Sequence, residues 1–168
     1  MSRPIKVQIK RSEHGKGLPL PTQMTEHAAG FDLAAAVGET VTLQPGDIKL
    51  IPCGFSMAVP HGYEAQVRPR SGLASKHGIT MVNAPGTIDS GFRGEIKVNL
   101  LNTDTSATVR LRRGDNVGQL VFQRVGWASF EVADELEESV RGERGHGSSG
   151  GVAGWTSVGT DLSTSSQE

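Results

Sequence analysis

The sequence predicts an all-β fold, a jelly-roll-like β-sandwich or distorted barrel with one short helix and a flexible C-terminal arm. Glycine supplies 22 of the 168 residues and aromatic residues only 5% of the chain, a composition typical of turns and short strands. From Thr40 onward, runs of β-type residues recur between Pro-Gly, His-Gly and Gly-Asp turns. This close spacing indicates an antiparallel sandwich or jelly roll.

The candidate strands are taken in chain order. Residues 5–10 alternate apolar and polar side chains, which is the period of a strand with one buried face. The small residues of 29–36 fit either a tightly packed strand or a short helix. Further strands are expected in the runs TVTLQPGD, IKLIPCGFSMAVP, YEAQVRP, ITMVNA, EIKVNLLN, ATVRLRRGD, VGQLVFQRV and WASFEV.

The short helix is expected over residues 71–78, with Ser71 as its N-cap and Gly78 as its C′ residue. The acidic run 131–139 is expected to be a solvated strand end or a short helix that leads out of the domain. The chain is long enough for one core and short for two. We therefore expect one domain over residues 1–140. Residues 141–168 form a Gly/Ser-rich arm with too few apolar residues to fold alone.

Charge and cysteine content argue against several classes of protein. The formal net charge of −1 lacks the broad positive surface that binding a nucleic-acid polymer requires, although a small anion held locally is compatible with it. The single Cys53 has no partner for an intrachain disulfide and no metal-site spacing, which favours a reducing compartment. Neither a signal region nor a membrane span is apparent. We expect a cytoplasmic protein.

Asp89 is the first candidate for chemistry. It lies among glycines, between the runs ITMV and EIKVNLL, so it is expected at a hairpin where backbone groups approach a ligand closely. A carboxylate in that position can act as a general base. The alternative is ordinary turn chemistry, since Asp and Gly are common in turns for backbone reasons alone.

The hexapeptide PRSGLA is a candidate phosphate cradle. Pro69 presets a turn, Arg70 is a bidentate phosphate donor, and Ser71 supplies a hydroxyl group. The amides of Ser71, Gly72 and Leu73 would point out of a helix N-terminus, where anions are favoured. The alternative is a capped helix with a surface arginine.

Two further strings are compatible with a polyphosphate ligand. The amide of Gln119 is a second candidate phosphate donor, or alternatively a polar group on the outer face of a strand. The tail string GERGHGSSGG lacks the Gly-Lys-Ser/Thr end of a P-loop, but its arginine, histidine and serines suit a mobile flap over a base and its phosphates. The tripeptide at 113–115 is interpreted as a tight turn.

Five strings occur together in a characteristic order: AGFDLAA (29–35), PRSGLA (69–74), NAPGTIDSGFRGEI (83–96), GDNVGQLVFQR (114–124) and RGERGHGSSGG (141–151). They resemble the five ordered motifs of the homotrimeric deoxyuridine triphosphate nucleotidohydrolases, the dUTPases, and the resemblance covers residues 5 to 151. It implies a jelly-roll trimer that hydrolyses dUTP to dUMP and pyrophosphate with Mg²⁺. This reaction keeps uracil out of DNA and supplies dUMP for thymidylate synthesis. The three sites would lie between subunits, each covered by an arm from a neighbouring chain.

The resemblance also implies residue roles on the nucleoside side. Asp89 would deprotonate the water that attacks the α-phosphorus. Phe92 would pack on the deoxyribose, with Lys97 near the base. The uracil edge would be read by one side chain and a short stretch of backbone: Asn83, Gly86, Thr87, Ile88 and Asp89.

On the phosphate side, the resemblance implies that Asp32 supports the magnesium region through water. The phosphates would be held by Arg70, Ser71, Gly72 and Gln119. The arm would contribute Arg141, His146, Gly147, Ser148 and Ser149, with the histidine stacking on uracil and the arginine and serines contacting phosphate. Three residues depart from the family pattern: Phe92 and His146 stand where tyrosine and phenylalanine are usual, and Arg144 replaces a glycine.

Two alternatives have different chemistry. The related deoxycytidine triphosphate deaminases have a glutamate on the strand after the substrate turn, whereas this chain has Asn99 at the comparable position and lacks their Arg-Ser-Ser string. A non-catalytic binding protein on a jelly-roll scaffold would use the same turns only for structure. The presence of Asp89 and Arg141 favours the hydrolase.

Overall fold

The computed structural model describes residues 4–144, which divide into two units between Ala128 and Ser129. The first unit holds the regular elements: β1 (Gln8–Arg11), the 3₁₀ turn η1 (Glu13–Gly15), β2 (Phe31–Ala34), β3 (Val41–Leu43), β4 (Ile48–Ala58), β5 (Tyr63–Arg68), α1 (Ser71–His77), β6 (Ile79–Met81), β7 (Gly86–Ile88), β8 (Glu95–Asn102), β9 (Val109–Leu111) and β10 (Asn116–Arg124). The predicted domain boundary at residue 140 stays a prediction.

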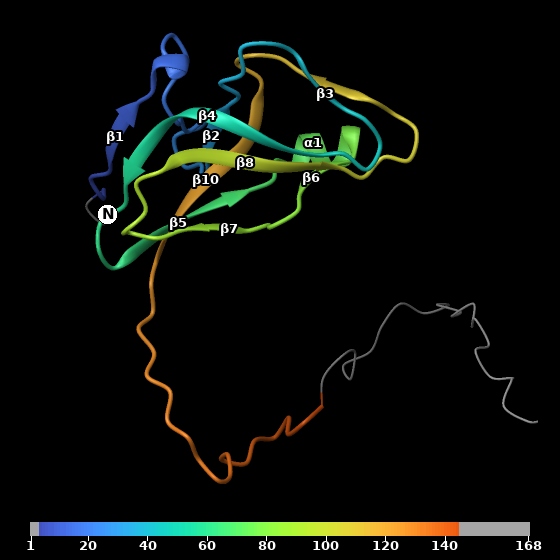
Figure 1. The fold of residues 1–168 in the computed structure, drawn as a ribbon. Helices are drawn as coiled ribbons and strands as arrows, with labels where there is room; N and C mark the ends of the chain where they lie inside the picture. Colours follow the sequence, from blue (N-terminus) through green and yellow to red (C-terminus); the bar gives the residue numbers. More distant parts are fainter. Residues whose placement is uncertain (1–3, 145–168) are drawn as a thin grey trace, which may run out of the picture. The chain divides into compact units, whose positions relative to one another are not determined.

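Within residues 4–144, ten strands form two four-stranded sheets and one small ribbon (Figure 1). Sheet A has the order β1-β4-β8-β6, sheet B the order β2-β10-β5-β7, and β3 pairs with β9. Every strand pair is antiparallel. The predicted all-β sandwich is therefore confirmed, and α1 is the one α-helix of residues 4–144.

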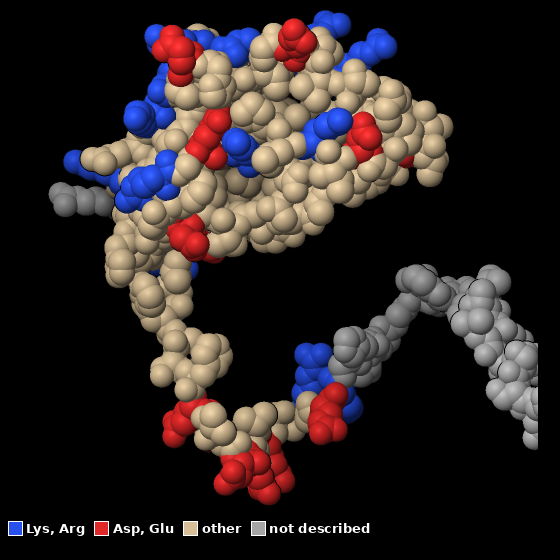
Figure 2. Space-filling model, in the orientation of Figure 1, with Lys and Arg blue, Asp and Glu red and all other residues tan. Residues whose placement is uncertain are grey.

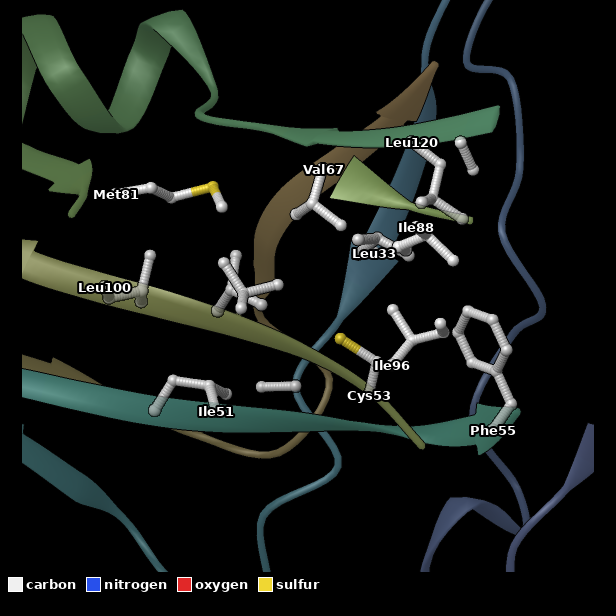
Figure 3. Close-up of a cluster of buried hydrophobic side chains, with 14 of the residues drawn as sticks. Leu33, Ile51, Cys53, Phe55, Val67, Met81, Ile88, Ile96, Leu100 and Leu120 are labelled. Carbon is white, nitrogen blue, oxygen red and sulfur yellow. The ribbon is translucent and has the colours of Figure 1, made fainter. Parts of the chain in front are cut away.

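The core lies between the two large sheets. Along β8 the residues alternate between outside and inside, so Ile96, Val98 and Leu100 are fully buried. Figure 3 shows such side chains from sheet A meeting Val67 and Leu120 of sheet B. Each fully buried aliphatic side chain of this kind contributes about 1.5–3 kcal/mol relative to exposure. Packing on both inner faces thus fixes which strand residues face outward.

Some strand predictions need correction. The predicted strand at 5–10 is β1 at 8–11, at the edge of sheet A, and all four of its residues are exposed, so the expected buried face is absent. The ambiguous run at 29–36 contains a strand, β2, so the helical alternative is wrong. The run WASFEV and the acidic run after it contain neither strand nor helix, and their residues are exposed.

The predicted helix is present, but its N-cap lies one residue earlier in the chain than expected. Arg70 is the N-cap, because its carbonyl accepts the N–H groups of Leu73 at 3.1 Å and Ala74 at 3.0 Å, and Ser71 is the first helical residue. The predicted N-cap at Ser71 is therefore wrong by one position. Gly78 ends the helix in the left-handed region at φ 61°, as predicted.

The connection from β6 to β8 differs most from its prediction. The two strands pair as a hairpin in sheet A, but the chain between them crosses to sheet B. There residues 86–88 form β7, which pairs with Ala65–Val67 of β5. Asp89 therefore follows an edge strand of the second sheet and does not lie in a simple hairpin turn.

Residues 129–144 are exposed, and Figure 2 shows acidic side chains gathering on the segment that follows residue 130. This segment, residues 129–144, holds six Asp or Glu and two Arg. On the visible face of the first unit, acidic and basic side chains are interspersed, in keeping with the small net charge (Figure 2). None of the helices between residues 4 and 144 has the length and apolar character needed to cross a bilayer.

Candidate functional site

A hollow of about 260 Å³ beside β7, here the β7 hollow, brings together six predicted site residues. These are Asn83, Gly86, Thr87, Ile88, Phe92 and Lys97. They come from β7, from the turns on either side of it, and from β8. Among the described residues predicted for base and sugar contact, only Asp89 does not line this hollow. His146, predicted to stack on the base, lies outside the described residues.

The shape of the β7 hollow depends on β7 pairing with β5. Gly86 and Ile88 are buried against sheet B, so the backbone of β7 is held at the wall of the hollow. A Cβ atom added to Gly86 would lie 3.2 Å from Nδ2 of Asn83, tighter than ordinary contact. Glycine at this position therefore leaves space for the Asn83 side chain.

Asp89 begins a tight turn that ends before β8. The Phe92 N–H donates to the Asp89 carbonyl at 3.1 Å. Nη1 of Arg93 donates to the carbonyls of Ser90 and Phe92, both at 2.7 Å. Asp89 is exposed, and the Phe92 ring is 44% exposed. The turn is thus held by one backbone hydrogen bond and by the Arg93 side chain, with the carboxylate and the ring accessible.

A second group of predicted residues surrounds Arg70. Its Nη2 donates to Oδ2 of Asp32 at 3.0 Å, and Nδ2 of Asn116 donates to the same oxygen at 3.2 Å. Nε2 of Gln119 donates to the Pro69 carbonyl at 3.0 Å. The side chains of Asp32 and Arg70 are 14% and 34% exposed. We call these four residues, Asp32, Arg70, Asn116 and Gln119, the Arg70 cluster.

Two hollows adjoin the Arg70 cluster, one of about 500 Å³ and one of about 400 Å³. Arg70, Ser71 and Gln119 line both, and Asp32 and Gly72 line the smaller one. The predicted cradle of three helix amides is wrong in one respect, because the Leu73 N–H already donates to the Arg70 carbonyl. The amides of Ser71 and Gly72 have no acceptor among the described residues.

Asp32 is the carboxylate of the Arg70 cluster. Within residues 4–144 no group of three or more His, Cys, Asp or Glu side chains is arranged to hold a metal ion. Both side-chain hydrogen bonds to Asp32 use Oδ2, and Oδ1 has no side-chain donor in the described part of the chain. A single free carboxylate oxygen beside open space fits a hydrated Mg²⁺ that takes its other ligands from phosphate and water.

The β7 hollow and the larger hollow beside Arg70 are lined by opposite faces of β5. Val67 is buried and lines the first, while its neighbours Gln66 and Arg68 line the second. Successive side chains of a strand point to opposite faces of the sheet. One chain therefore does not gather the residues predicted for base contact and those predicted for phosphate contact in a single cavity.

Sequence reasoning missed three residues near these sites. Asn116 joins the Arg70 cluster, Arg68 lines the larger hollow, and Glu95 lines the β7 hollow. Asn116 and Glu95 lie inside two of the five ordered strings, but their partners are 84 and 81 residues away in the chain. No local signal could have identified these contacts.

The arm residues are described only in part. Nε of Arg141 donates to the Arg144 carbonyl at 2.8 Å, and Nε of Arg144 donates to the Arg141 carbonyl at 3.0 Å. Both arginines are exposed. The other residues predicted for the arm, His146, Gly147, Ser148 and Ser149, lie outside the described residues.

Comparison with known proteins gives the same family from sequence and from structure. The dUTPase family model matches residues 16–150. A deoxyuridine 5'-triphosphate nucleotidohydrolase of Maricaulis maris is 50% identical over 148 residues, covering 87% of this chain and 97% of the relative. A protein of the same name from Thermobifida fusca is 51% identical over 149 residues, covering 89% and 81%.

The fold matches solved structures of the dUTPase of Staphylococcus bacteriophage 80alpha. One, with dUpNHpp, is 26% identical, with a TM-score of 0.76 over 86% of this chain and 98% of that one. A mutant with the same ligand is 25% identical, also with a TM-score of 0.76. With a family model across most of its length and relatives at half identity, the chain belongs to the dUTPase family.

Proposed function

We propose that this chain hydrolyses dUTP to dUMP and pyrophosphate. The observation that carries the proposal is the identity of 50% to a relative named deoxyuridine 5'-triphosphate nucleotidohydrolase, over 97% of its length. The β7 hollow, lined by six residues that the sequence predicts to contact the nucleoside, supports it.

The uracil base would bind in the β7 hollow against Asn83 and the backbone of β7. An amide side chain and an ordered strand edge present fixed donors and acceptors, and a site of that kind discriminates strongly against bases with a different edge. The exposed ring of Phe92 would pack on the deoxyribose. Lys97, on the outer face of β8, would lie near the base.

Asp89 would orient the attacking water and take its proton. Phosphoryl transfer requires in-line positioning and charge neutralisation more than covalent chemistry, so one carboxylate at the end of β7 is sufficient as the base. Its exposure and the turn that follows it support this role, because the carboxylate is accessible to a substrate seated in the adjoining hollow.

Arg70, Ser71, Gly72 and Gln119 would hold the phosphates. A guanidinium group is a strong bidentate donor to phosphate, and the free amides of Ser71 and Gly72 add two donors to it. Asp32 would support Mg²⁺ through water, using its unoccupied Oδ1. Bound to the phosphates, the ion would neutralise charge and orient the α-phosphate.

The active unit would be a homotrimer with sites between subunits. Because opposite faces of β5 line the β7 hollow and the larger hollow beside Arg70, a second copy is needed to bring nucleoside and phosphate residues into one site. The second unit also carries large apolar side chains that are nearly fully exposed: Phe130, Val132, Leu136 and Val140. Such side chains require a covering surface, which a neighbouring chain would provide. The arm, with Arg141, His146, Gly147, Ser148 and Ser149, would then close over the substrate.

In the cell, the reaction would keep uracil out of DNA and supply dUMP for thymidylate synthesis. A cytoplasmic location belongs to the same proposal, and the single buried Cys53 is compatible with a reducing compartment. The proposed partners include neither a nucleic-acid polymer nor a membrane.

Pyrophosphate release tests the proposal directly. The purified protein with Mg²⁺ should release pyrophosphate from dUTP and release far less from dTTP, dCTP or UTP at equal concentration. Ammonia release from dCTP would instead identify a deaminase. Failure to turn over any of the four nucleotides would favour the non-catalytic binding protein.

A further inference from the structure

Glu95 begins β8, lines the β7 hollow and is attached to two distant parts of the chain. Its Oε1 accepts the Gly54 N–H at 2.9 Å. The same oxygen lies 2.6 Å from Nε2 of His14, and because a carboxylate only accepts, the imidazole donates. The two side chains are 48% exposed for His14 and 22% for Glu95. One carboxylate oxygen thus joins β8, the middle of β4 and the turn η1.

Gly54 marks an irregularity in the pairing of β4 with β8. The register shifts between Pro52 and Ser56, which partner Lys97 and Glu95. Gly54 has a φ of +75°, the left-handed conformation that glycine tolerates best. A strand pairing that shifts in this way leaves backbone groups without a ladder partner, and Glu95 supplies the acceptor for the Gly54 amide.

The turn η1 packs directly on the backbone of Gly54. The Ser12 N–H donates to the Gly54 carbonyl at 2.9 Å. A Cβ atom added to Gly15 would lie 1.9 Å from that carbonyl oxygen, so only glycine permits this approach. From the other side, Arg113 donates to the carbonyls of His14 at 2.8 Å and Lys16 at 2.7 Å. His14 is therefore held in place independently of Glu95.

We propose that Glu95 is a positioning residue for the nucleoside half of the site, with His14 and Gly54 as its anchors. The inference rests on the proposed function. Glu95 begins the strand that follows the turn carrying Asp89 and Phe92, and that turn is exposed and held only by local hydrogen bonds from its backbone and from Arg93. Fixing Glu95 fixes the C-terminal end of the turn, and with it the ring that packs on the sugar and the carboxylate that activates water.

The test separates nucleoside binding from phosphate binding. Glu95→Ala should weaken dUMP binding and raise the KM for dUTP by about tenfold, with a smaller fall in kcat. Inhibition by pyrophosphate, which reports the phosphate side, should stay within about twofold of wild type. Glu95→Gln keeps an acceptor for Gly54 but loses the charged partner of His14, so its effect should be smaller than that of Glu95→Ala.

A double-mutant cycle isolates the contact. His14→Ala should have about the effect of Glu95→Gln, and the two changes combined should add little, because both remove the same interaction. Lys16→Gln is the matched control. It breaks an exposed ion pair with Glu13 on the same turn, at 2.7 Å, that makes no contact with the β7 hollow. This control should retain wild-type binding and turnover.

Each outcome has a distinct meaning. If the wild type neither binds dUMP nor hydrolyses dUTP, the proposed function fails. If the wild type is active and Glu95→Gln and His14→Ala both keep its dUMP affinity and KM, the positioning role is overturned. Equal losses in dUMP binding and pyrophosphate inhibition also overturn it, because they indicate a general loss of structure. If Glu95→Ala fails to fold, Glu95→Gln and His14→Ala still decide the question, because these substitutions disturb the structure less.

Discussion

The β7 hollow and the Arg70 cluster are organised by different forces. The β7 hollow is a cavity at the edge of the sandwich, where Val67, Ile88 and Ile96 extend the apolar core and the backbone of an edge strand forms the wall. The Arg70 cluster lies over sheet B and is held by hydrogen bonds between charged and polar side chains. Packing fixes the first region, and electrostatic pairing fixes the second.

Because of this difference, the two regions should respond differently to salt and to substitution. A cavity defined by backbone and core residues is insensitive to salt and discriminates by shape and by hydrogen-bonding edge. A partly exposed ion pair is screened by salt and contributes little to folding stability. Variants in the Arg70 cluster should therefore affect phosphate contacts with small changes in stability. Variants around the β7 hollow should separate nucleotide binding from turnover, changing one with little effect on the other.

The largest effect is expected from Asp89→Asn. Removing a general base should lower kcat by about 100-fold to 10,000-fold, since the amide cannot take a proton from water. The side chain is exposed and does not line the β7 hollow, so dUMP affinity and thermal stability should stay close to wild type. Turnover, calorimetric dUMP binding and a melting curve measure these quantities. A variant with unchanged kcat would remove Asp89 from the mechanism.

Arg70→Ala should have the next largest effect. A hydrogen bond to a charged group is worth about 1.5–3 kcal/mol, so kcat/KM for dUTP should fall by about 10-fold to 100-fold. Inhibition by deoxyuridine, which has no phosphate, should be unchanged. Arg70→Lys keeps the charge and loses the planar guanidinium, so its kcat/KM for dUTP should lie between those of wild type and Arg70→Ala. An equal loss of deoxyuridine binding would contradict the division between the two regions.

Gly30→Ala should act on the Arg70 cluster through Gln119. A Cβ atom at residue 30 would lie 2.2 Å from Oε1 of Gln119, and the flexible amide would have to move. Losing one neutral hydrogen bond costs about 1 kcal/mol, so the KM for dUTP should rise severalfold, as in Gln119→Ala. Gly38→Ala is the matched control, because nothing lies within 4 Å of its added Cβ. Steady-state kinetics on the three variants measure this. Equal KM values for Gly30→Ala and Gly38→Ala would contradict the prediction.

The smallest effect concerns Cys53, whose neighbour Gly54 donates to Glu95 at the β7 hollow. Burial, and secondarily the negative charge of Glu95, raise the pKa of the Cys53 thiol from 9.0 to about 12. The folded-state pKa is above the unfolded one, so the stabilisation is complete below about pH 9 and is lost as pH rises from there towards 12. By pH 10 the loss should be about 1 kcal/mol. Urea unfolding at pH 8 and pH 10 should show this component in wild type and not in Cys53→Ala. The same pH dependence in both proteins would count against it.

Local sequence predicted the parts of the fold that local forces decide. The alternation of β8, the left-handed Gly78 and the turn at residues 112–115 all follow from side-chain period and backbone preference. Strand β7 could not be predicted in this way. Its three residues follow a proline and include a glycine, so they have the composition of a turn, and they form a strand only because β5 offers a free edge.

The site was predictable mainly through ordered motifs. The predicted roles based on those motifs covered six of the residues that line the β7 hollow and three of the four members of the Arg70 cluster. They did not predict that Arg70 pairs with Asp32, since 38 residues separate the two in sequence. The attachment of Glu95 to His14 was equally inaccessible, because pairing across 81 residues depends on how the sheets assemble.

The central claim is that the β7 hollow of one chain works with the Arg70 cluster of another. Mixing two impaired variants tests it: Asp89→Asn and Arg70→Ala chains are unfolded together, refolded at equal amounts and assayed for pyrophosphate release at a dUTP concentration where each variant alone is far below wild type. If each site combines two neighbouring chains of a trimeric ring, random assembly restores both residues in about a quarter of the sites, and activity recovers to about that fraction of wild type. If the activity of the mixture stays at the average of the two variants measured separately, each site is built within a single chain and the account is contradicted.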